Sequence, residues 1–202
     1  MVVLKLYSAF YLSIYPNHAV ILVSMIKRIE NNLREFVYGG MDGAVTTFAI
    51  VTGAAGANFS AKVILILGLA NVFADAFSMA VGAYLSDKAD QELEAKNSDE
   101  AKEYESPIEA SIATFISFVL VGFVPLSVYI VDYIFSLGLS DSNAALNYSI
   151  TLTLIAFAGI GYLRAVVTHI DKIKSTLETL GLGLAAAIIS FGLGSVLEGV
   201  IT

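Results

Sequence analysis

Long apolar stretches separated by short polar segments make up most of this chain. Five of them lie at residues 36–57, 61–85, 108–135, 148–168 and 180–201. An α-helix needs about 20 mainly apolar residues to cross the hydrocarbon core of a bilayer, and each stretch is that long. The pattern therefore predicts an all-α polytopic membrane protein with five transmembrane helices.

A sixth apolar stretch, residues 2–26, is interrupted by a lysine and by a Pro-Asn-His sequence. It could form an additional N-terminal helix or lie in the membrane interface, and Met25 is an alternative start of translation. No small-residue cleavage site is evident in it, which argues against a cleaved signal peptide. We therefore expect an N-terminal apolar segment with a charged cytoplasmic flank (residues 1–33), followed by a five-helix transmembrane domain (residues 34–202).

One hydrophilic stretch, residues 86–107, separates the second and third predicted spans. Helix-forming residues dominate it, and Asn97-Ser98 could divide it into two short helices. It could be a solvated hairpin or linker, or an acidic funnel that concentrates cations at the mouth of a pore. The acidic residues that would attract cations are Asp87, Asp90, Glu92, Glu94, Glu103 and Glu105.

Basic residues gather at one end of the predicted spans, whereas the loops at the opposite end contain only Lys62. The residues at the basic end are Lys27, Arg28, Arg34, Lys88, Lys96, Lys102, Arg164, Lys172 and Lys174. The positive-inside rule therefore places the N-terminal flank and the acidic loop in the cytoplasm. We expect an integral membrane protein, in the cell membrane if the organism is a prokaryote.

The composition supports the membrane class and excludes several functions. Of the 202 residues, 57% are hydrophobic and 14% are charged, and the mean hydropathy is +0.78. A soluble domain of this size cannot bury that much apolar surface. The chain has no cysteine and a formal net charge of −7, which argue against a thiolate metal site and against nucleic-acid binding.

The second predicted span carries a stripe of polar and sulfur-containing residues. Asn71, Asp75 and Met79 are each four residues from the next, so they lie within about 80° of one another around a helix. A charged side chain at the bilayer centre costs about 2.5–3.5 kcal/mol, and it usually has a function. Oxygen and thioether ligands together suit a divalent metal of intermediate softness. The alternative is that the two polar residues bond to neighbouring helices and Met79 fills the core.

The first predicted span carries a second carboxylate, Asp42, between two glycines and one turn before Thr46. Because the turn after this span is short, the first two spans should be antiparallel neighbours. Asp42 and Asp75 would then lie at similar depths and could share one metal, with help from Thr46. Carboxylates in a low-dielectric site can also exchange protons for metal, which suits cation–proton exchange.

Two other classes of function remain as rivals. Paired transmembrane aspartates can form an aspartic protease, but the chain has neither a Gly-x-Gly-Asp motif nor a Gly-x-Ser-x-Gly elbow. His169 follows a predicted helix end near Asp171, where a solvated or capping role fits better than catalysis. A structural or signalling module would leave the aspartates unexplained. We therefore expect no enzymatic activity and no cofactor.

Three segments of this sequence resemble the vacuolar iron transporter family. Residues 34–45, REFVYGGMDGAV, are similar to its opening motif, a basic residue followed by Gly-x-x-Asp-Gly. Residues 74–85, ADAFSMAVGAYL, are similar to its second helix, and residues 122–126, GFVPL, to its third. The resemblance covers residues 34–202 in motif order.

This resemblance implies a homodimeric transporter in the lipid bilayer that moves Fe²⁺, and also Mn²⁺, out of the cytoplasm against protons. The family's first-helix aspartate and second-helix methionine line the ion path and correspond to Asp42 and Met79. The sequence departs from the family at two places. Asn71 stands where some members have a glutamate, and residues 86–107 are too short for the three-helix metal-binding domain of long-loop members. The alternative is a channel or uniporter for another divalent cation.

Overall fold

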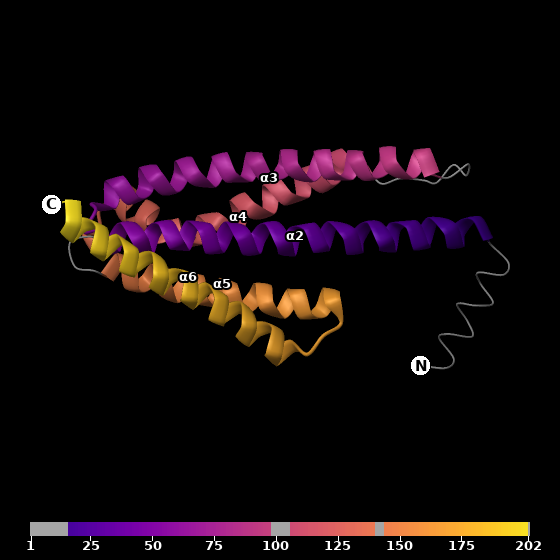
Figure 1. Cartoon of the computed structure of the whole chain (residues 1–202). Helices are drawn as coiled ribbons and strands as arrows, with labels where there is room; N and C mark the ends of the chain where they lie inside the picture. The colour runs from indigo at the N-terminus through magenta and orange to yellow at the C-terminus, as the bar shows by residue number, and fades with distance from the viewer. Residues whose placement is uncertain (1–15, 98–105, 140–143, 202) are drawn as a thin grey trace.

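The structure is a computed structural model that describes residues 16–97, 106–139 and 144–201, with the side chains of the first range described from residue 33 to residue 95. These ranges form five α-helices and contain no strand. The helices are α2 Pro16–Gly56, α3 Ala61–Asn97, α4 Pro107–Phe135, α5 Ala144–Thr168 and α6 Lys172–Ile201 (Figure 1).

Four helices, α3 to α6, are long and apolar enough to cross a membrane. Within the described ranges α2 does not reach that level, because glycines, threonines and Asp42 lower its hydropathy. It instead contacts each of the other four helices, so polar positions along it can pack against protein. The prediction of an all-α polytopic membrane protein is confirmed, with α2 as the central helix.

Several helix boundaries differ from those predicted by hydropathy. α3 continues past residue 85 to Asn97, because the helix-forming residues of the hydrophilic stretch extend it. α5 begins at Ala144, four residues earlier than expected. α6 begins at Lys172, eight residues before the predicted span at residues 180–201. Its start is capped, because the Asp171 carboxylate accepts a hydrogen bond from the Lys174 backbone N–H at 2.7 Å.

The N-terminal segment also differs from the simplest expectation. Residues 16–26 are not a separate helix but the first turns of α2, which crosses the expected boundary between residues 33 and 34. Residues 1–15 lie outside the described residues. Figure 1 shows α2 and α3 running side by side and extending beyond α5 and α6 at one end of the bundle.

The turn between α2 and α3 is short, as predicted. Asn58 adopts a left-handed φ of 54°, a conformation that asparagine tolerates better than most residues. The Phe59 backbone N–H donates to the Ala54 carbonyl at 2.9 Å. This reversal makes α2 and α3 antiparallel neighbours, so Asp42 on α2 and Asp75 on α3 lie on adjacent helices.

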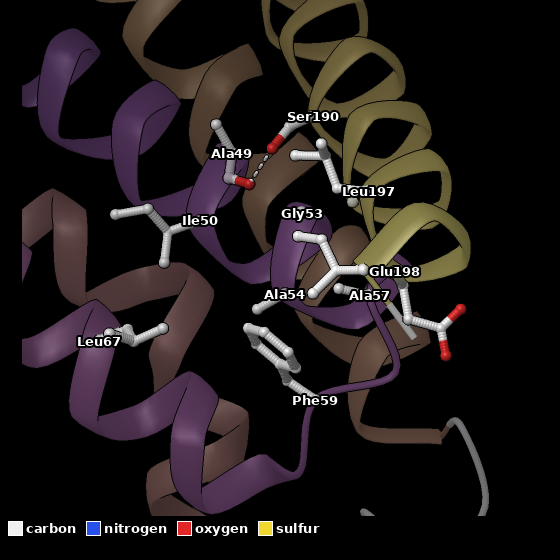
Figure 2. A pocket seen from close by; sticks show the side chains of 12 residues that line it. Ala49, Ile50, Gly53, Ala54, Ala57, Phe59, Leu67, Ser190, Leu197 and Glu198 are labelled. Atoms are coloured by element: carbon white, nitrogen blue, oxygen red, sulfur yellow. Dashed lines mark hydrogen bonds between the residues drawn. The ribbon is translucent and has the colours of Figure 1, made fainter.

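Glycines allow α2 to approach α4 and α6 closely. A Cβ atom at Gly43 would collide with the backbone carbonyl oxygen of Phe118 on α4. One at Gly194 on α6 would collide with the carbonyl oxygen of Gly53 on α2. At the same contact the Ser190 hydroxyl donates to the Ala49 carbonyl (Figure 2). Small residues and backbone-directed hydroxyls therefore hold these helices together, as is typical of membrane proteins.

This packing predicts opposite effects for two glycines on α6. Gly194→Ala should lower the free energy of unfolding by about 1–3 kcal/mol, because the new methyl group would push α6 away from α2. Gly192→Ala is the matched control, since no atom lies within 4 Å of its added Cβ, and it should be neutral or stabilising. Thermal unfolding of the two purified variants in one detergent measures the difference, and equal stabilities would contradict the packing.

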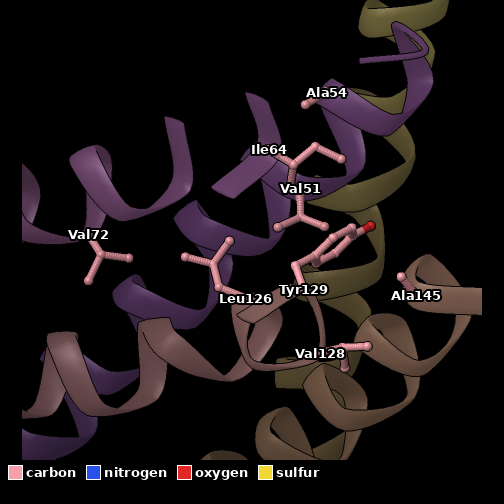
Figure 3. Close-up of a cluster of buried hydrophobic side chains, with 8 residues drawn as sticks. All are labelled: Val51, Ala54, Ile64, Val72, Leu126, Val128, Tyr129 and Ala145. Carbon is pink, nitrogen blue, oxygen red and sulfur yellow. The ribbon is translucent and has the colours of Figure 1, made fainter. Parts of the chain in front are cut away.

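Two hydrophobic clusters fix α2 from different sides. The first joins α2, α3, α4 and α5, as Figure 3 shows, and its members are Val51, Ala54, Ile64, Val72, Leu126, Val128, Tyr129 and Ala145. The second joins α2 to α5 and α6, with Phe48 and Phe157 packed edge to face at a centroid distance of 5.9 Å. Because both clusters hold α2, the direction in which Asp42 points is set by the packing of the whole bundle.

Candidate metal site

The predicted stripe on α3 is present, and two of its members are directly bonded. The Asn71 Nδ2 amide donates a hydrogen bond to Asp75 Oδ2 at 2.7 Å. Both side chains are half-buried. Asn71 was predicted as a metal ligand through its amide oxygen, and in the structure its NH₂ group holds one oxygen of the Asp75 carboxylate. The amide oxygen and the second carboxylate oxygen keep acceptor lone pairs.

Asp42 on α2 belongs to the same site as Asp75. The two carboxylates lie close enough for their charges to interact, and Asp42 is half-buried. Nearby like charges destabilise each other unless a cation or protons neutralise them. A pair of this kind inside a membrane bundle is therefore a natural place for a positively charged ligand.

Thr46 and Met79 flank this pair. The Thr46 hydroxyl donates to the Asp42 backbone carbonyl at 2.8 Å, so its proton is used within α2 while its oxygen remains an acceptor. Met79 is half-buried and lies one helical turn, about 6 Å, beyond Asp75 along α3. The predicted set of five residues therefore supplies carboxylate, amide, hydroxyl and thioether donors from two adjacent helices.

The charge of the site matches a divalent ion. In the part of the chain that the structure describes, no three His, Cys, Asp or Glu residues form a group that could hold a metal. The candidate site therefore contains two carboxylates, Asp42 and Asp75, and its other side chains are neutral. Two carboxylates balance one divalent cation, whereas a third would hold the ion more tightly and slow its release.

The acidic loop residues do not join this site. Asp87, Asp90, Glu92 and Glu94 lie on the extension of α3, and Asp87 is twelve residues, about 18 Å, from Asp75. Three of the four are exposed and Asp87 is half-buried. Glu103 and Glu105 lie outside the described residues. The acidic funnel therefore stays a prediction. Its four described residues lie on the end of α3, well beyond the two aspartates.

A cavity that the sequence did not reveal lies between the candidate site and the opposite end of the bundle. Leu67, one turn before Asn71 on α3, borders it, and so does Gly53 on α2. The cavity measures about 480 Å³ and lies between α2, α3 and α6, with Glu198 at its rim (Figure 2). Its lining is almost entirely apolar. Sequence reasoning missed it because it depends on how α6 crosses α2.

Comparison with known proteins identifies the family. The sequence model described as the VIT family matches residues 33–104 and 92–195, which together cover most of the chain. The chain belongs to the VIT family. The matched range contains Asp42, Asp75 and Met79, so the candidate site lies within the part of the protein that defines its VIT membership.

Named relatives extend the match over four-fifths of the chain. The protein is 30% identical to vacuolar iron transporter homolog 3 of Arabidopsis thaliana over 169 residues, covering 79% of this chain and 80% of the relative. It is 25% identical to the vacuolar iron transporter of Plasmodium falciparum, covering 84% and 83%. A shorter alignment with the vacuolar iron transporter of Toxoplasma gondii reaches 44% identity over 37% of this chain and 25% of that protein.

Proposed function

We propose that this VIT family member exports divalent transition metal, Fe²⁺ and also Mn²⁺, from the cytoplasm in exchange for protons. Membership of the family and the names of its relatives support a membrane-embedded metal transporter rather than an enzyme. The observation that carries the proposal is the pair of interacting aspartates on the adjacent helices α2 and α3. A carboxylate pair of this kind needs a cationic partner inside a bilayer.

Proton exchange follows from the same pair. A divalent ion between Asp42 and Asp75 neutralises both carboxylates, and its departure restores their mutual repulsion. Binding of protons removes that repulsion in the low dielectric of the bundle. The empty carrier is therefore more stable when protonated, which couples release of metal to uptake of protons.

The path beyond the site leads into the apolar cavity between α2, α3 and α6. Ile50, Leu67 and Leu197 line it, and they offer a hydrated ion no polar partner. We propose that α6 moves relative to α2 to wet this cavity when the ion leaves. An apolar segment that opens and closes by wetting is an established way of gating ion paths.

A second copy of the chain is the proposed partner. The most apolar windows of α3 and α6 are only 22% and 11% buried within one chain. Lipid can cover such faces, but the half-buried aspartates also need shielding from hydrocarbon. A homodimer that covers the face bearing Asp42 and Asp75 provides that shielding.

The alignments support a short-loop form of the family. The alignment with the Plasmodium falciparum protein runs over 228 positions, more than the 202 residues of this chain, so that relative has additional residues within the aligned range. The alignment with the Arabidopsis thaliana homolog 3 needs only 169 positions. We propose that capture of metal relies on the acidic extension of α3 instead of a separate cytoplasmic domain.

Reconstituted transport tests the proposal. Proteoliposomes that contain a pH dye should take up Fe²⁺ and Mn²⁺ and show proton movement in the opposite direction, and empty liposomes should show neither. Metal flux without proton movement would replace the exchanger with a channel or uniporter. Absence of both metal fluxes from folded, reconstituted protein would overturn metal transport by this site.

The bond between Asn71 and Asp75 predicts a separate effect. Asn71→Leu removes the amide that holds Asp75 Oδ2, and loss of a bond that orients a metal ligand typically costs 10–100-fold in affinity. We expect Mn²⁺ flux at subsaturating metal to fall about tenfold, with a smaller change in maximal rate. Asn147→Leu, an exposed asparagine on α5, is the control. Equal apparent Mn²⁺ affinities in the two variants would show that Asn71 does not position Asp75.

A further inference from the structure

A pocket with two arginines in its lining lies toward the basic end of the bundle, on the far side of the aspartates from the apolar cavity. It measures about 390 Å³, and α2 and α5 form it. Its lining residues are Arg34, Glu35, Val37, Tyr38, Met41 and Arg164. Along α2 the lining runs from Arg34, about 12 Å beyond Asp42 toward the basic end, to Met41, the residue just before Asp42. Metal transport gives no role to this pocket.

Two guanidinium groups from helices distant in the sequence face this pocket. Arg34 is exposed, and no described residue forms an ion pair or hydrogen bond with its side chain. Arg164 forms an ion pair through Nη1 with Glu178 at 3.2 Å, which leaves most of its five N–H donors available. The one carboxylate in the lining, Glu35, accepts a hydrogen bond from the Thr114 hydroxyl at 3.3 Å. The lining therefore carries a net positive charge in a chain whose net charge is −7.

Tyrosines mark this pocket as lying at the membrane surface. Tyr38 in the lining is 65% exposed, and Tyr162, two residues before Arg164 on α5, is 48% exposed. Lys172 lies over the Tyr162 ring at 5.1 Å from its centroid. Tyrosine and basic side chains together are typical of the boundary between hydrocarbon and headgroups. The pocket is therefore placed where phospholipid phosphates lie.

We propose that this pocket binds the headgroup of an anionic phospholipid. Arg34 and Arg164 would hold the phosphate, because the guanidinium fork matches phosphate oxygens in paired hydrogen bonds. The Tyr38 hydroxyl at the rim adds a donor, and Val37 and Met41 offer an apolar floor to the glycerol and the first acyl carbons. Basic pockets between transmembrane helices are known to take such headgroups. The bound lipid ties α2 to α5, and this role holds whatever ion the protein carries.

Lipid titration of the purified full-length protein in detergent tests this site. Phosphatidylglycerol should raise the melting temperature and bind more tightly than phosphatidylcholine in native mass spectrometry. Arg34→Gln should weaken phosphatidylglycerol binding about tenfold, as expected for losing charged hydrogen bonds, and leave phosphatidylcholine binding unchanged. Lys62→Gln, an exposed basic residue at the opposite end of the bundle, is the matched control and should bind both lipids as the unmodified protein does.

A second arginine variant and two soluble phosphate compounds complete the test. Arg164→Gln should repeat the loss, and it replaces Arg34→Gln if that variant does not fold. Glycerol phosphate and inorganic phosphate, which lack acyl chains, should neither stabilise the protein nor displace the lipid at millimolar concentration. Stabilisation by inorganic phosphate that Arg34→Gln abolishes would assign the pocket to a soluble phosphate compound instead. Equal phosphatidylglycerol binding by Arg34→Gln, Arg164→Gln and Lys62→Gln would overturn the site.

Discussion

Asp42→Asn is expected to lower metal flux at least about 100-fold while the protein still folds. The substitution keeps the shape of the side chain but removes one of the two negative charges of the proposed metal site. Asp42 and a bound metal ion would form a pair of opposite charges. Removing one partner of such a buried pair typically costs about 3–5 kcal/mol, and 100-fold corresponds to about 2.7 kcal/mol. Without metal, the variant should be at least as stable as the original protein, because the repulsion between Asp42 and Asp75 is gone. Proteoliposome uptake of Fe²⁺ and Mn²⁺ measures the first effect, and thermal unfolding measures the second.

Asp171→Asn is the matched control for this prediction. Asp171 caps α6 through the Lys174 backbone N–H, and asparagine caps a helix about as well as aspartate. The control makes the same chemical change outside the membrane-spanning part, and its flux should match that of the original protein. Normal flux in Asp42→Asn, or an equal loss of flux in Asp171→Asn, would show that Asp42 is not part of the ion path.

Met79→Leu is expected to lower Fe²⁺ flux about tenfold and Mn²⁺ flux by less. Met79 lies one turn from Asp75 on the site-facing stripe of α3 and is half-buried. Leucine keeps its volume and costs less than about 1.5 kcal/mol of stability, but it has no sulfur. Thioether ligands favour softer ions, and Fe²⁺ binds such sites more tightly than Mn²⁺. The ratio of Fe²⁺ to Mn²⁺ flux in one proteoliposome preparation is therefore the measurement that isolates the sulfur.

Met41→Leu serves as the control for Met79→Leu. Met41 packs beside the cluster formed by α2, α5 and α6, next to Asp42 in sequence but on a different side of α2. Its replacement should change neither flux nor the ratio of the two fluxes. A parallel fall in both fluxes for Met79→Leu would indicate a packing role, and an unchanged ratio would exclude sulfur as the source of selectivity.

The sequence by itself determined the class of the protein and the stripe on α3. Bilayer thickness sets the length of a spanning helix, so hydropathy located the apolar part of each span without knowledge of the fold. The spacing of Asn71, Asp75 and Met79 placed them on one face, because helix periodicity depends only on neighbouring residues. Helix ends were less well determined. α3 runs on to Asn97 and α6 begins at Lys172, since helix propensity and the Asp171 cap act in segments that hydropathy treats as loops.

Only the tertiary structure decided which groups meet. Asp42 lies near enough to Asp75 for their charges to interact, and glycines that let α2 approach α4 and α6 set the rotation of α2. The sequence predicted Asn71 only as a metal ligand. The structure adds that its amide donates a hydrogen bond to Asp75, which depends on how the two side chains are oriented. Arg34 and Arg164 share a pocket because α5 packs against α2. Contacts between distant segments arise from the packing of all five helices together, and local sequence patterns carry no record of that packing.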